Sequence, residues 1–340
     1  MSYSIGVDLG GTNLRIAAVD EQGHLLEKIT LGTRLALGRD QVINDMCEAI
    51  RGLEATYQGR ASLQGIGVGV AGIIDMRKGM LRESPNLPGW ADYPVRAEIE
   101  KRLGTQVVLE NDANCAALGE KWLGAGREVD DMAMLTLGTG VGGGIVLGGR
   151  IWHGMTGMAG EFGHMTIEPD GVPCKCGGRG CLEQYASATA VMRMAREKID
   201  AGAAPGLARA ASSDPEFSAK TVYKLAIQGD GVAQHVFSLV GSALGIALAT
   251  MVNGLNLPMY VIGGGVSGAW DAFSPTMFRE VRERSMVYAA TAPAARDQGD
   301  SAQVESGVVG TRTIITRALL GSDAGLYGAA RVAVMGGAWR

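Results

Sequence analysis

One histidine and three cysteines lie close together near the middle of the chain, and their side chains could bind a metal ion. His164 is followed by Cys174, Cys176 and Cys181, and the run Gly-Gly-Arg-Gly separates the last two cysteines. Zn²⁺ prefers four nitrogen and sulfur ligands in a tetrahedron, and four protein ligands leave no position for water, so the sequence predicts a structural zinc. The alternative is a loop with buried thiols or a disulfide, which is disfavoured because three cysteines cannot all pair among themselves.

Two carboxylates flank this Cys3His cluster. Glu161 and His164 lead into it, and Glu183 follows soon after Cys181. A metal held by the cluster would therefore also fix both carboxylates and one edge of the imidazole in space.

Two glycine-rich segments, residues 5–19 and 132–146, resemble each other, and each predicts a strand, a glycine turn and a second strand. Such turns present successive backbone N–H groups to an anion, so the pair would clamp a polyphosphate between two lobes. Asp8 ends the first strand and could hold Mg²⁺ through water. A tight hairpin without a ligand explains the first segment nearly as well, but the matching second segment favours phosphate. The chain has no Gly-x4-Gly-Lys-Ser/Thr loop, which disfavours a P-loop enzyme.

The motif Glu110-Asn111-Asp112-Ala-Asn114 ends a predicted strand and opens a predicted helix. A carboxylate at this place is commonly an N-cap, and position alone favours that role for Asp112. The alternative is a general base, because an alcohol that attacks a phosphoryl group needs an acceptor for its proton.

Two weaker signals concern binding. The run Gly263-Gly264-Gly265 follows a buried strand and would let the backbone approach a flat ligand such as adenine. The loop around Asn86 is a turn by composition, yet the Asn86 amide offers both a donor and an acceptor to a sugar hydroxyl.

Composition sets the class of protein. The chain has 340 residues, enough for two lobes. Its net charge of -4 and its lack of a Lys/Arg block give no footprint for nucleic acid. We expect no secretory signal and no apolar stretch of about 18 residues, hence no membrane span. These features predict a cytoplasmic, reduced protein, in which clustered cysteines favour metal over disulfide and Cys47 and Cys115 are small buried hydrophobes.

The expected elements alternate between strand and helix, which predicts an α/β fold. Helices are expected at 40–57, 94–103, 113–122, 187–200, 218–228, 232–254 and 323–335, and further strands at 24–31, 66–74, 107–110 and 259–262. Two stretches, 201–215 and 289–310, are expected to be loops or insertions.

The chain resembles the ROK family (repressors, open reading frames, kinases) over residues 6 to about 330. The resemblance rests on Asp-Leu-Gly-Gly-Thr-Asn, Ser-Pro-Asn-Leu-Pro-Gly-Trp, Glu-Asn-Asp-Ala-Asn, Leu-Gly-Thr-Gly-Val-Gly-Gly-Gly, Ala-Gly-Glu-Phe-Gly-His and Cys-Gly-Gly-Arg-Gly-Cys-Leu-Glu-Gln-Tyr-Ala-Ser. It implies a two-lobed actin-like (ribonuclease-H-like) fold with sugar and ATP in the cleft between lobes. The expected lobes are residues 1–112 with 324–340, and residues 113–323.

The resemblance also implies roles for individual residues. It implies Asp112 as the base, against the preference from position, with capping as a second role. His164 would bind zinc through one ring nitrogen and point the other towards the sugar. The implied sugar contacts are Gly72, Asn86, Asn111, Asp112, Glu161, His164 and Glu183. The expected nucleotide contacts are Asp8, Gly10, Gly11, Thr12, Asn13, Gly138, Thr139, Gly140, Gly264 and Gly265.

The leading hypothesis is therefore an ATP:hexose 6-phosphotransferase, most like the bacterial glucokinases of the family, with ATP, Mg²⁺ and structural Zn²⁺. A kinase of N-acetylglucosamine, N-acetylmannosamine, mannose or fructose is the alternative enzyme, and polyphosphate is an alternative donor. A sugar-sensing regulator is a third hypothesis, disfavoured because the first strand begins at about Ser4, without a preceding helix-turn-helix. A homo-oligomer, dimer or tetramer, is expected, with no nucleic-acid or membrane partner. The 289–310 stretch is expected to be longer than in typical relatives.

Overall fold

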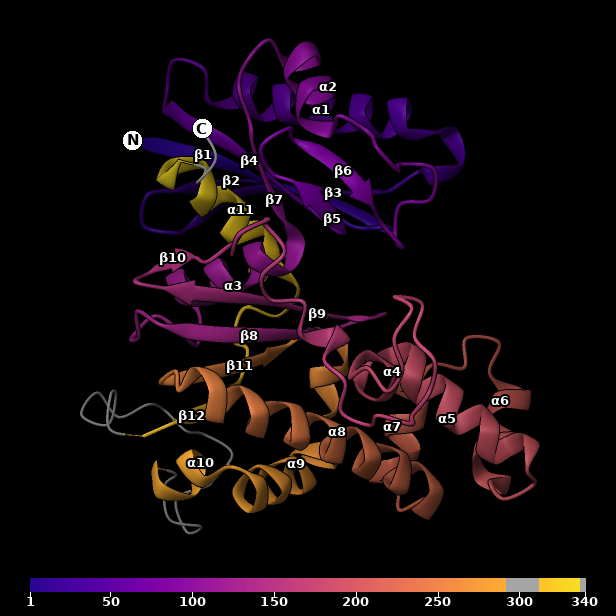
Figure 1. Cartoon of the computed structure of the whole chain (residues 1–340). Helices are drawn as coiled ribbons and strands as arrows, with labels where there is room; N and C mark the ends of the chain where they lie inside the picture. Colours follow the sequence, from indigo (N-terminus) through magenta and orange to yellow (C-terminus); the bar gives the residue numbers. More distant parts are fainter. Residues whose placement is uncertain (292–311, 337–340) are drawn as a thin grey trace. The chain divides into compact units, whose positions relative to one another are not determined.

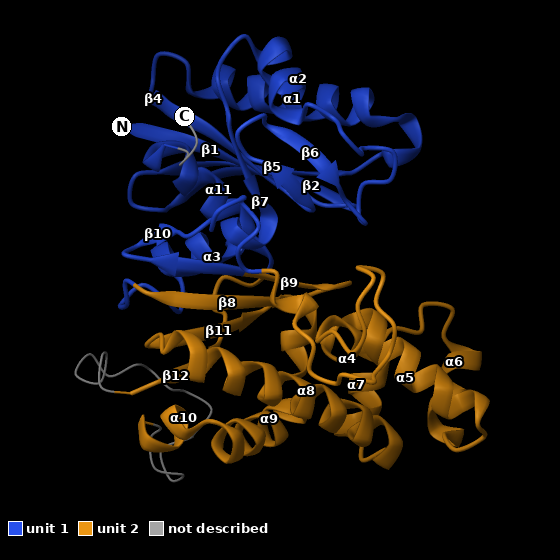
Figure 2. Cartoon of the chain, in the orientation of Figure 1, with its two compact units in different colours: residues 1–130, 144–160, 322–340 blue, residues 131–143, 161–321 orange. Residues whose placement is uncertain are grey.

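A computed structural model describes residues 1–291 and 312–336 of the chain. Within these residues the chain divides into two compact units (Figure 2). The described residues of unit 1 are 1–130, 144–160 and 322–336, and those of unit 2 are 131–143, 161–291 and 312–321.

Unit 1 contains a five-stranded sheet of order β3-β2-β1-β4-β7. Strand β2 pairs antiparallel with both β1 and β3, whereas β4 pairs parallel with both β1 and β7. Its strands are β1 (Ser2–Leu9), β2 (Asn13–Asp20), β3 (Leu25–Gly32), β4 (Ser62–Val70) and β7 (Val108–Asn111). A separate two-stranded sheet pairs β5 (Ile73–Asp75) with β6 (Met80–Glu83). The unit's α-helices are α1 (Arg39–Tyr57), α2 (Val95–Leu103), α3 (Asp112–Leu123) and α11 (Ala324–Met335).

Alternation along β2 explains how helices cover both faces of this sheet. Ile16 and Ala18 belong to the apolar cluster that includes the buried residues of α1, whereas Ala17 and Val19 pack with α11. Successive side chains of a strand point to opposite faces, so Ile16 and Ala18 pack in the core on one face of the sheet and Ala17 and Val19 pack in the core on the other. Figure 1 shows α1 and α2 on one side of these strands and α3 and α11 on the other.

A second five-stranded sheet has the order β10-β9-β8-β11-β12. It consists of β8 (Met132–Leu137), β9 (Val141–Leu147), β10 (Arg150–Ile151), β11 (Met259–Gly263) and β12 (Ile314–Arg317). Strands β8 and β9 are joined by the second glycine turn, and β11 runs parallel to β8 and β12. The remaining α-helices are α4 (Glu183–Ala186), α5 (Ala188–Asp200), α6 (Pro205–Ser213), α7 (Ala219–Ile227), α8 (Gly231–Leu255), α9 (Trp270–Arg284) and α10 (Met286–Thr291).

Helix α8 is long and apolar enough to cross a membrane, so the expectation that no apolar stretch of this length occurs is wrong. Its side chains, however, are mostly buried: 67% of its most apolar window lies inside the protein. That burial is typical of the core helix of a soluble α/β protein, and α8 packs against α9 and α7.

The structure corrects three expectations about elements. The stretch 201–215, expected as a loop, contains α6, which begins at Pro205. The strand expected over 66–74 ends at Val70 and is followed by the separate strand β5, because Gly72 has a φ of 129° that only glycine adopts readily. The stretch 289–310 begins inside α10, and the rest of it lies outside the described residues.

The observed units also differ from the expected lobes, whose boundary lay between Asp112 and Ala113. Residues 113–130 and 144–160 belong to unit 1. The reason is that α3 packs closely along α11, where a Cβ on Gly328 would lie 1.7 Å from the Cys115 carbonyl oxygen. Such an approach is open only to glycine, and it ties α3 to the unit that contains α11.

Candidate functional site

The turn from β7 to α3 places Asp112 at the first position of the helix. The Asn111 side chain caps α3, because its Oδ1 accepts the backbone N–H groups of Ala113 and Asn114 at 2.9 and 3.1 Å. Asn111 Nδ2 donates to the Gly72 carbonyl oxygen at 3.1 Å. The capping role expected for Asp112 is therefore wrong, since the strand extends one residue further than expected and puts Asn111 at the cap.

The first glycine turn lies beside Asp8 and Asn86 in unit 1. The Gly10 N–H donates to the Asn13 carbonyl at 3.0 Å, which closes the turn. A Cβ on Gly11 would lie 2.6 Å from the Asn86 carbonyl oxygen, so the two loops are in contact. The amide of Gly10 thus belongs to the turn, and the anion-binding prediction rests on the N–H groups of Gly11 and Thr12.

Asp8 ends β1 beside this turn, and its carboxylate pairs with Arg15, a residue that the sequence analysis did not single out. The Arg15 Nη1 to Asp8 Oδ2 distance is 2.9 Å. Burial raises the pKa of Asp8 above its usual range, and Arg15 opposes that shift. A carboxylate of this kind fits a Mg²⁺ ion, which favours oxygen ligands.

The second glycine turn is held by α4 and the start of α5. The Gly138 N–H donates to the Gly140 carbonyl at 2.9 Å, so this amide also belongs to its own turn. Glu183 Oε2 accepts the Val141 N–H at 3.0 Å, and the Ala188 N–H donates to the Gly138 carbonyl at 2.8 Å. The carboxylate predicted to contact sugar therefore also supports the turn predicted to contact phosphate.

The other predicted nucleotide contacts lie next to the second turn. Gly264 has a φ of 83°, and a Cβ there would lie 2.5 Å from the Leu137 carbonyl oxygen. Since Leu137 immediately precedes Gly138, the two glycine segments meet at the ends of the parallel strands β8 and β11. Ends of parallel strands are where α/β proteins commonly bind ligands.

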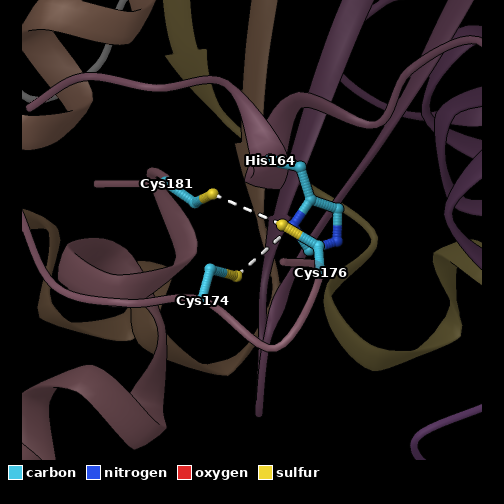
Figure 3. Close-up of side chains that lie close together, drawn as sticks. All are labelled: His164, Cys174, Cys176 and Cys181. Carbon is cyan, nitrogen blue, oxygen red and sulfur yellow. Dashed lines mark hydrogen bonds between the residues drawn. The ribbon is translucent and has the colours of Figure 1, made fainter. Parts of the chain in front are cut away.

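The Cys3His cluster converges on one point (Figure 3). Its four ligand atoms all lie within 4.8 Å of one another. Cys174 Sγ is 3.7 Å from His164 Nδ1, and Cys176 Sγ is 3.6 Å from Cys181 Sγ. A tetrahedron with Zn–S bonds of about 2.3 Å has edges of about 3.8 Å, whereas a disulfide needs about 2.05 Å. The cluster therefore fits zinc and not the disulfide alternative.

The surroundings shift the pKa values of two cysteines of the cluster and of the nearby Glu161. The backbone N–H of Gly178 lowers the pKa of the exposed Cys176 thiol, whereas burial raises the pKa of Cys181 to about 12. The Glu161 pKa is raised, mainly because protein displaces solvent around its carboxylate. The Glu183 charge adds to this shift, and His164 opposes it. The charges of His164 and Glu183 therefore both act on the Glu161 carboxylate.

The predicted site residues fall into one group in each unit. Unit 1 contains Asp8, Gly10, Gly11, Thr12, Asn13, Gly72, Asn86, Asn111 and Asp112. Unit 2 contains Gly138, Thr139, Gly140, Glu161, His164, Cys174, Cys176, Cys181, Glu183, Gly264 and Gly265. Beside Asp112 the structure adds Glu110, Asn114 and His153, which are all buried. No short-range pattern links His153 to Glu110, because 43 residues separate them.

Comparison with known proteins gives a consistent match. The model of the ROK family matches residues 4–334. The chain is 39% identical to a glucokinase of Thermotoga maritima over 96% of each chain. It is 38% identical to a glucokinase of Halalkalibacterium halodurans, over 84% of this chain and 86% of the other.

Among solved structures, the chain is similar to a ROK family glucokinase from Streptomyces griseus in complex with glucose and AMPPNP. The identity is 32%, the TM-score is 0.76, and the match covers 98% of this chain and 100% of that one. This likeness confirms the expected α/β, actin-like fold.

Proposed function

The chain belongs to the ROK family, and on that premise we propose that it is a glucokinase, which transfers the γ-phosphoryl group of ATP to the 6-hydroxyl of glucose. The observation that supports this most strongly is the position of Asp112. Asp112 is the first residue of α3, and Asn111 makes the capping hydrogen bonds, so the cap of the helix does not depend on replacing or keeping the Asp112 carboxylate that we assign to proton transfer.

In the proposed reaction, Asp112 accepts the proton of the sugar's 6-hydroxyl as that oxygen attacks the γ-phosphorus. The new O–P bond forms, the bond from the γ-phosphorus to the β–γ bridging oxygen breaks, and ADP leaves. Backbone N–H groups of Gly11, Thr12, Thr139 and Gly140 stabilise the charge on the phosphates, because amides fixed in turns need no reorganisation.

Asp8 would hold Mg²⁺, and that ion would supply neutralisation of phosphate charge. Arg15 pairs with Asp8 and so adds a positive charge at the same carboxylate. Gly264 and Gly265 would lie against the adenine.

We assign the sugar contacts to Gly72, Asn86, Asn111, Asp112, Glu161, His164 and Glu183. His164 faces the cluster through Nδ1, which leaves its other ring edge for a sugar hydroxyl. The zinc is structural in this proposal, and it orients His164 and Glu183 instead of taking part in phosphoryl transfer.

The cellular setting is part of the same proposal. We place the protein in the cytoplasm, as a homodimer or homotetramer without a nucleic-acid partner. Three reduced cysteines around one zinc are compatible with a reducing compartment.

The test is a coupled ADP-release assay on the purified protein with a panel of sugars. Glucose should give the highest kcat/KM among glucose, mannose, fructose, N-acetylglucosamine and N-acetylmannosamine, with glucose 6-phosphate as the product by phosphorus NMR. A preference for an N-acetylated sugar would replace glucokinase by another ROK kinase. Sugar binding without ADP release would instead support a sugar-sensing regulator, and turnover with polyphosphate would extend the donor range.

Metal analysis tests the zinc separately. One equivalent of zinc per chain is expected, and Cys176→Ser should lose the metal together with thermal stability. Fully active protein without stoichiometric zinc would contradict this assignment.

A further inference from the structure

A buried histidine–glutamate hydrogen bond lies next to the turn that carries Asp112. Glu110 Oε2 and His153 Nε2 are 2.7 Å apart, and the two residues are 1% and 8% exposed. Glu110 belongs to β7, whereas His153 follows the short strand β10. Both residues are in unit 1, and neither belongs to the site expected from the sequence.

The other Glu110 oxygen holds the chain on both sides of Asp112. Oε1 accepts the Asn111 N–H at 2.9 Å and Asn114 Nδ2 at 2.9 Å. Asn111 precedes Asp112, and Asn114 lies two residues after it in the first turn of α3. One carboxylate therefore joins the end of the strand to the start of the helix, and His153 is the group that fixes that carboxylate from outside.

Stability alone does not account for this arrangement. A buried hydrogen bond between polar side chains contributes little net stability, because the loss of both groups' contacts with water offsets their attraction. Its effect is instead to fix geometry, since removal of one partner leaves a buried carboxylate oxygen without its hydrogen bond and frees it to turn. Catalysis is sensitive to such freedom, because a misplacement of about 1 Å can cost about 10²-fold in rate.

We propose that His153 is a positioning residue for phosphoryl transfer: through Glu110 it holds Asn111 and Asp112 at the sugar. The inference rests on the proposed kinase activity. His153 touches no substrate in this proposal, and its effect reaches the reaction through the Glu110 carboxylate.

The first experiment compares His153→Phe with His153→Gln in the full-length protein. Phenylalanine fills the space without a hydrogen-bonding group, so kcat should fall roughly 10- to 100-fold. The KM for glucose should rise severalfold because Asn111 moves, whereas the KM for ATP should stay within about twofold. Glutamine can donate to Glu110 Oε2, so it should restore most of the turnover. A general loss of folded protein would lower kcat without changing either KM.

A double-mutant cycle tests the route through Glu110. If His153 acts through that carboxylate, His153→Phe should cost less than about threefold in a Glu110→Gln background, since interacting residues are non-additive. Multiplicative effects of the two changes would overturn the proposal, as would a folded His153→Phe variant with wild-type kcat and KM. If His153→Phe does not fold, His153→Leu takes its place in both experiments, because leucine is smaller and also lacks a hydrogen-bonding group.

The matched control is His24→Gln. His24 also pairs with a carboxylate of unit 1, Asp20, at 2.9 Å, but its side chain is 76% exposed. It should leave kcat and both KM values unchanged. Wild-type protein that phosphorylates no hexose would refute the proposed function itself, whereas active wild type with an unaffected His153→Phe variant would refute only this inference.

Discussion

At the scale of single residues, helix capping and proton transfer were both expected of Asp112, but at the start of α3 the neighbouring residue Asn111 is the cap. Asn111 makes the capping hydrogen bonds, and Asp112, the next residue, is the proposed proton acceptor. Asp112→Asn should therefore fold with wild-type stability and still bind glucose by calorimetry. Its kcat should fall by roughly 10² to 10⁴, the range of general-base catalysis.

The control for this change is Asp230→Asn. Asp230 caps α8 through the N–H groups of Val232 and Ala233, and asparagine caps about as well as aspartate. Turnover and stability should both survive there. If Asp112→Asn kept kcat within about threefold of wild type, a barrier change below 1 kcal/mol, Asp112 would not be the proton acceptor.

The part of the site that could be predicted from the sequence is the part formed by residues close together in the chain. Ligand chemistry within one segment sufficed for the Cys3His cluster, and the structure brings its four ligand atoms together. The identity of the cap at Asn111 was not predictable, because it depends on where β7 ends. The pairs of Asp8 with Arg15 and of Glu110 with His153 depend on sheet register and on long-range packing, which short motifs do not encode.

At the scale of elements, replacement by alanine should have opposite effects on stability at two helical glycines, Gly328 and Gly52. Gly328→Ala would put a Cβ 1.7 Å from the Cys115 carbonyl and force α11 away from α3. We expect a loss of about 1–3 kcal/mol or more in the free energy of unfolding. Gly52 lies within α1 with open space around its Cβ position, so Gly52→Ala should instead gain up to about 1 kcal/mol. Urea titrations measure both, and equal effects would contradict the close packing of α3 on α11.

The ion pair that ties α1 to the chain before it predicts a pH effect. Two hydrogen bonds from Arg34 hold the pKa of the buried Asp45 carboxyl below its usual range. A lowered pKa in the folded state means that the stabilisation is present above the ordinary value near 4 and is lost as pH falls through the folded value. Asp45→Asn should therefore lower Tm at pH 7, and the difference from wild type should shrink towards pH 3.

Asp92→Asn is the control for that titration. Asp92 pairs with Arg82 at the surface with a 70% exposed side chain, and such pairs contribute about 0–1 kcal/mol. Its Tm should follow wild type across the same range. An Asp45→Asn difference that did not change with pH would show that packing, not charge, accounts for the effect.

The long helices α1 and α8 were predictable because the period of their apolar residues is a local signal. Helix α9 was not expected from the sequence, and it carries Pro275 in its interior, which is typical of a helix break. Helix α6 was missed since its Ala/Gly/Ser-rich composition resembles a loop, although Pro205 at its first position is a helix-start signal. Strand β12 was missed because four residues carry little pattern, and its pairing with β11 joins positions far apart in the sequence.

At the scale of the whole molecule, unit 1 is discontinuous and depends on its last segment. Helix α11 packs against β1 and β4, where Cβ atoms on Gly6 and Gly67 would meet its backbone. A chain ending at Gly321 should therefore lose protection from hydrogen exchange in β1 and β4. It should keep its zinc, because all four ligands lie in unit 2. Unchanged exchange in β1 would show that α11 is dispensable.

The contacts between α4, the start of α5 and the second glycine turn imply a thermodynamic reciprocity. Glu183 and Ala188 hold that turn, and Thr189 Oγ1 donates to the Thr139 carbonyl at 2.7 Å, all within a few residues of Cys181. If zinc strengthens nucleotide binding through these contacts, nucleotide must strengthen zinc binding by the same factor.

Competition with a chromogenic chelator should then give a zinc dissociation constant that falls roughly fivefold or more with saturating AMPPNP. Thr189→Val, which removes one of the links, should reduce that factor, and equal constants with and without nucleotide would refute the coupling. Through this linkage, the zinc would dissociate more slowly or less completely from the nucleotide-bound protein than from the nucleotide-free protein, although the metal takes no part in phosphoryl transfer.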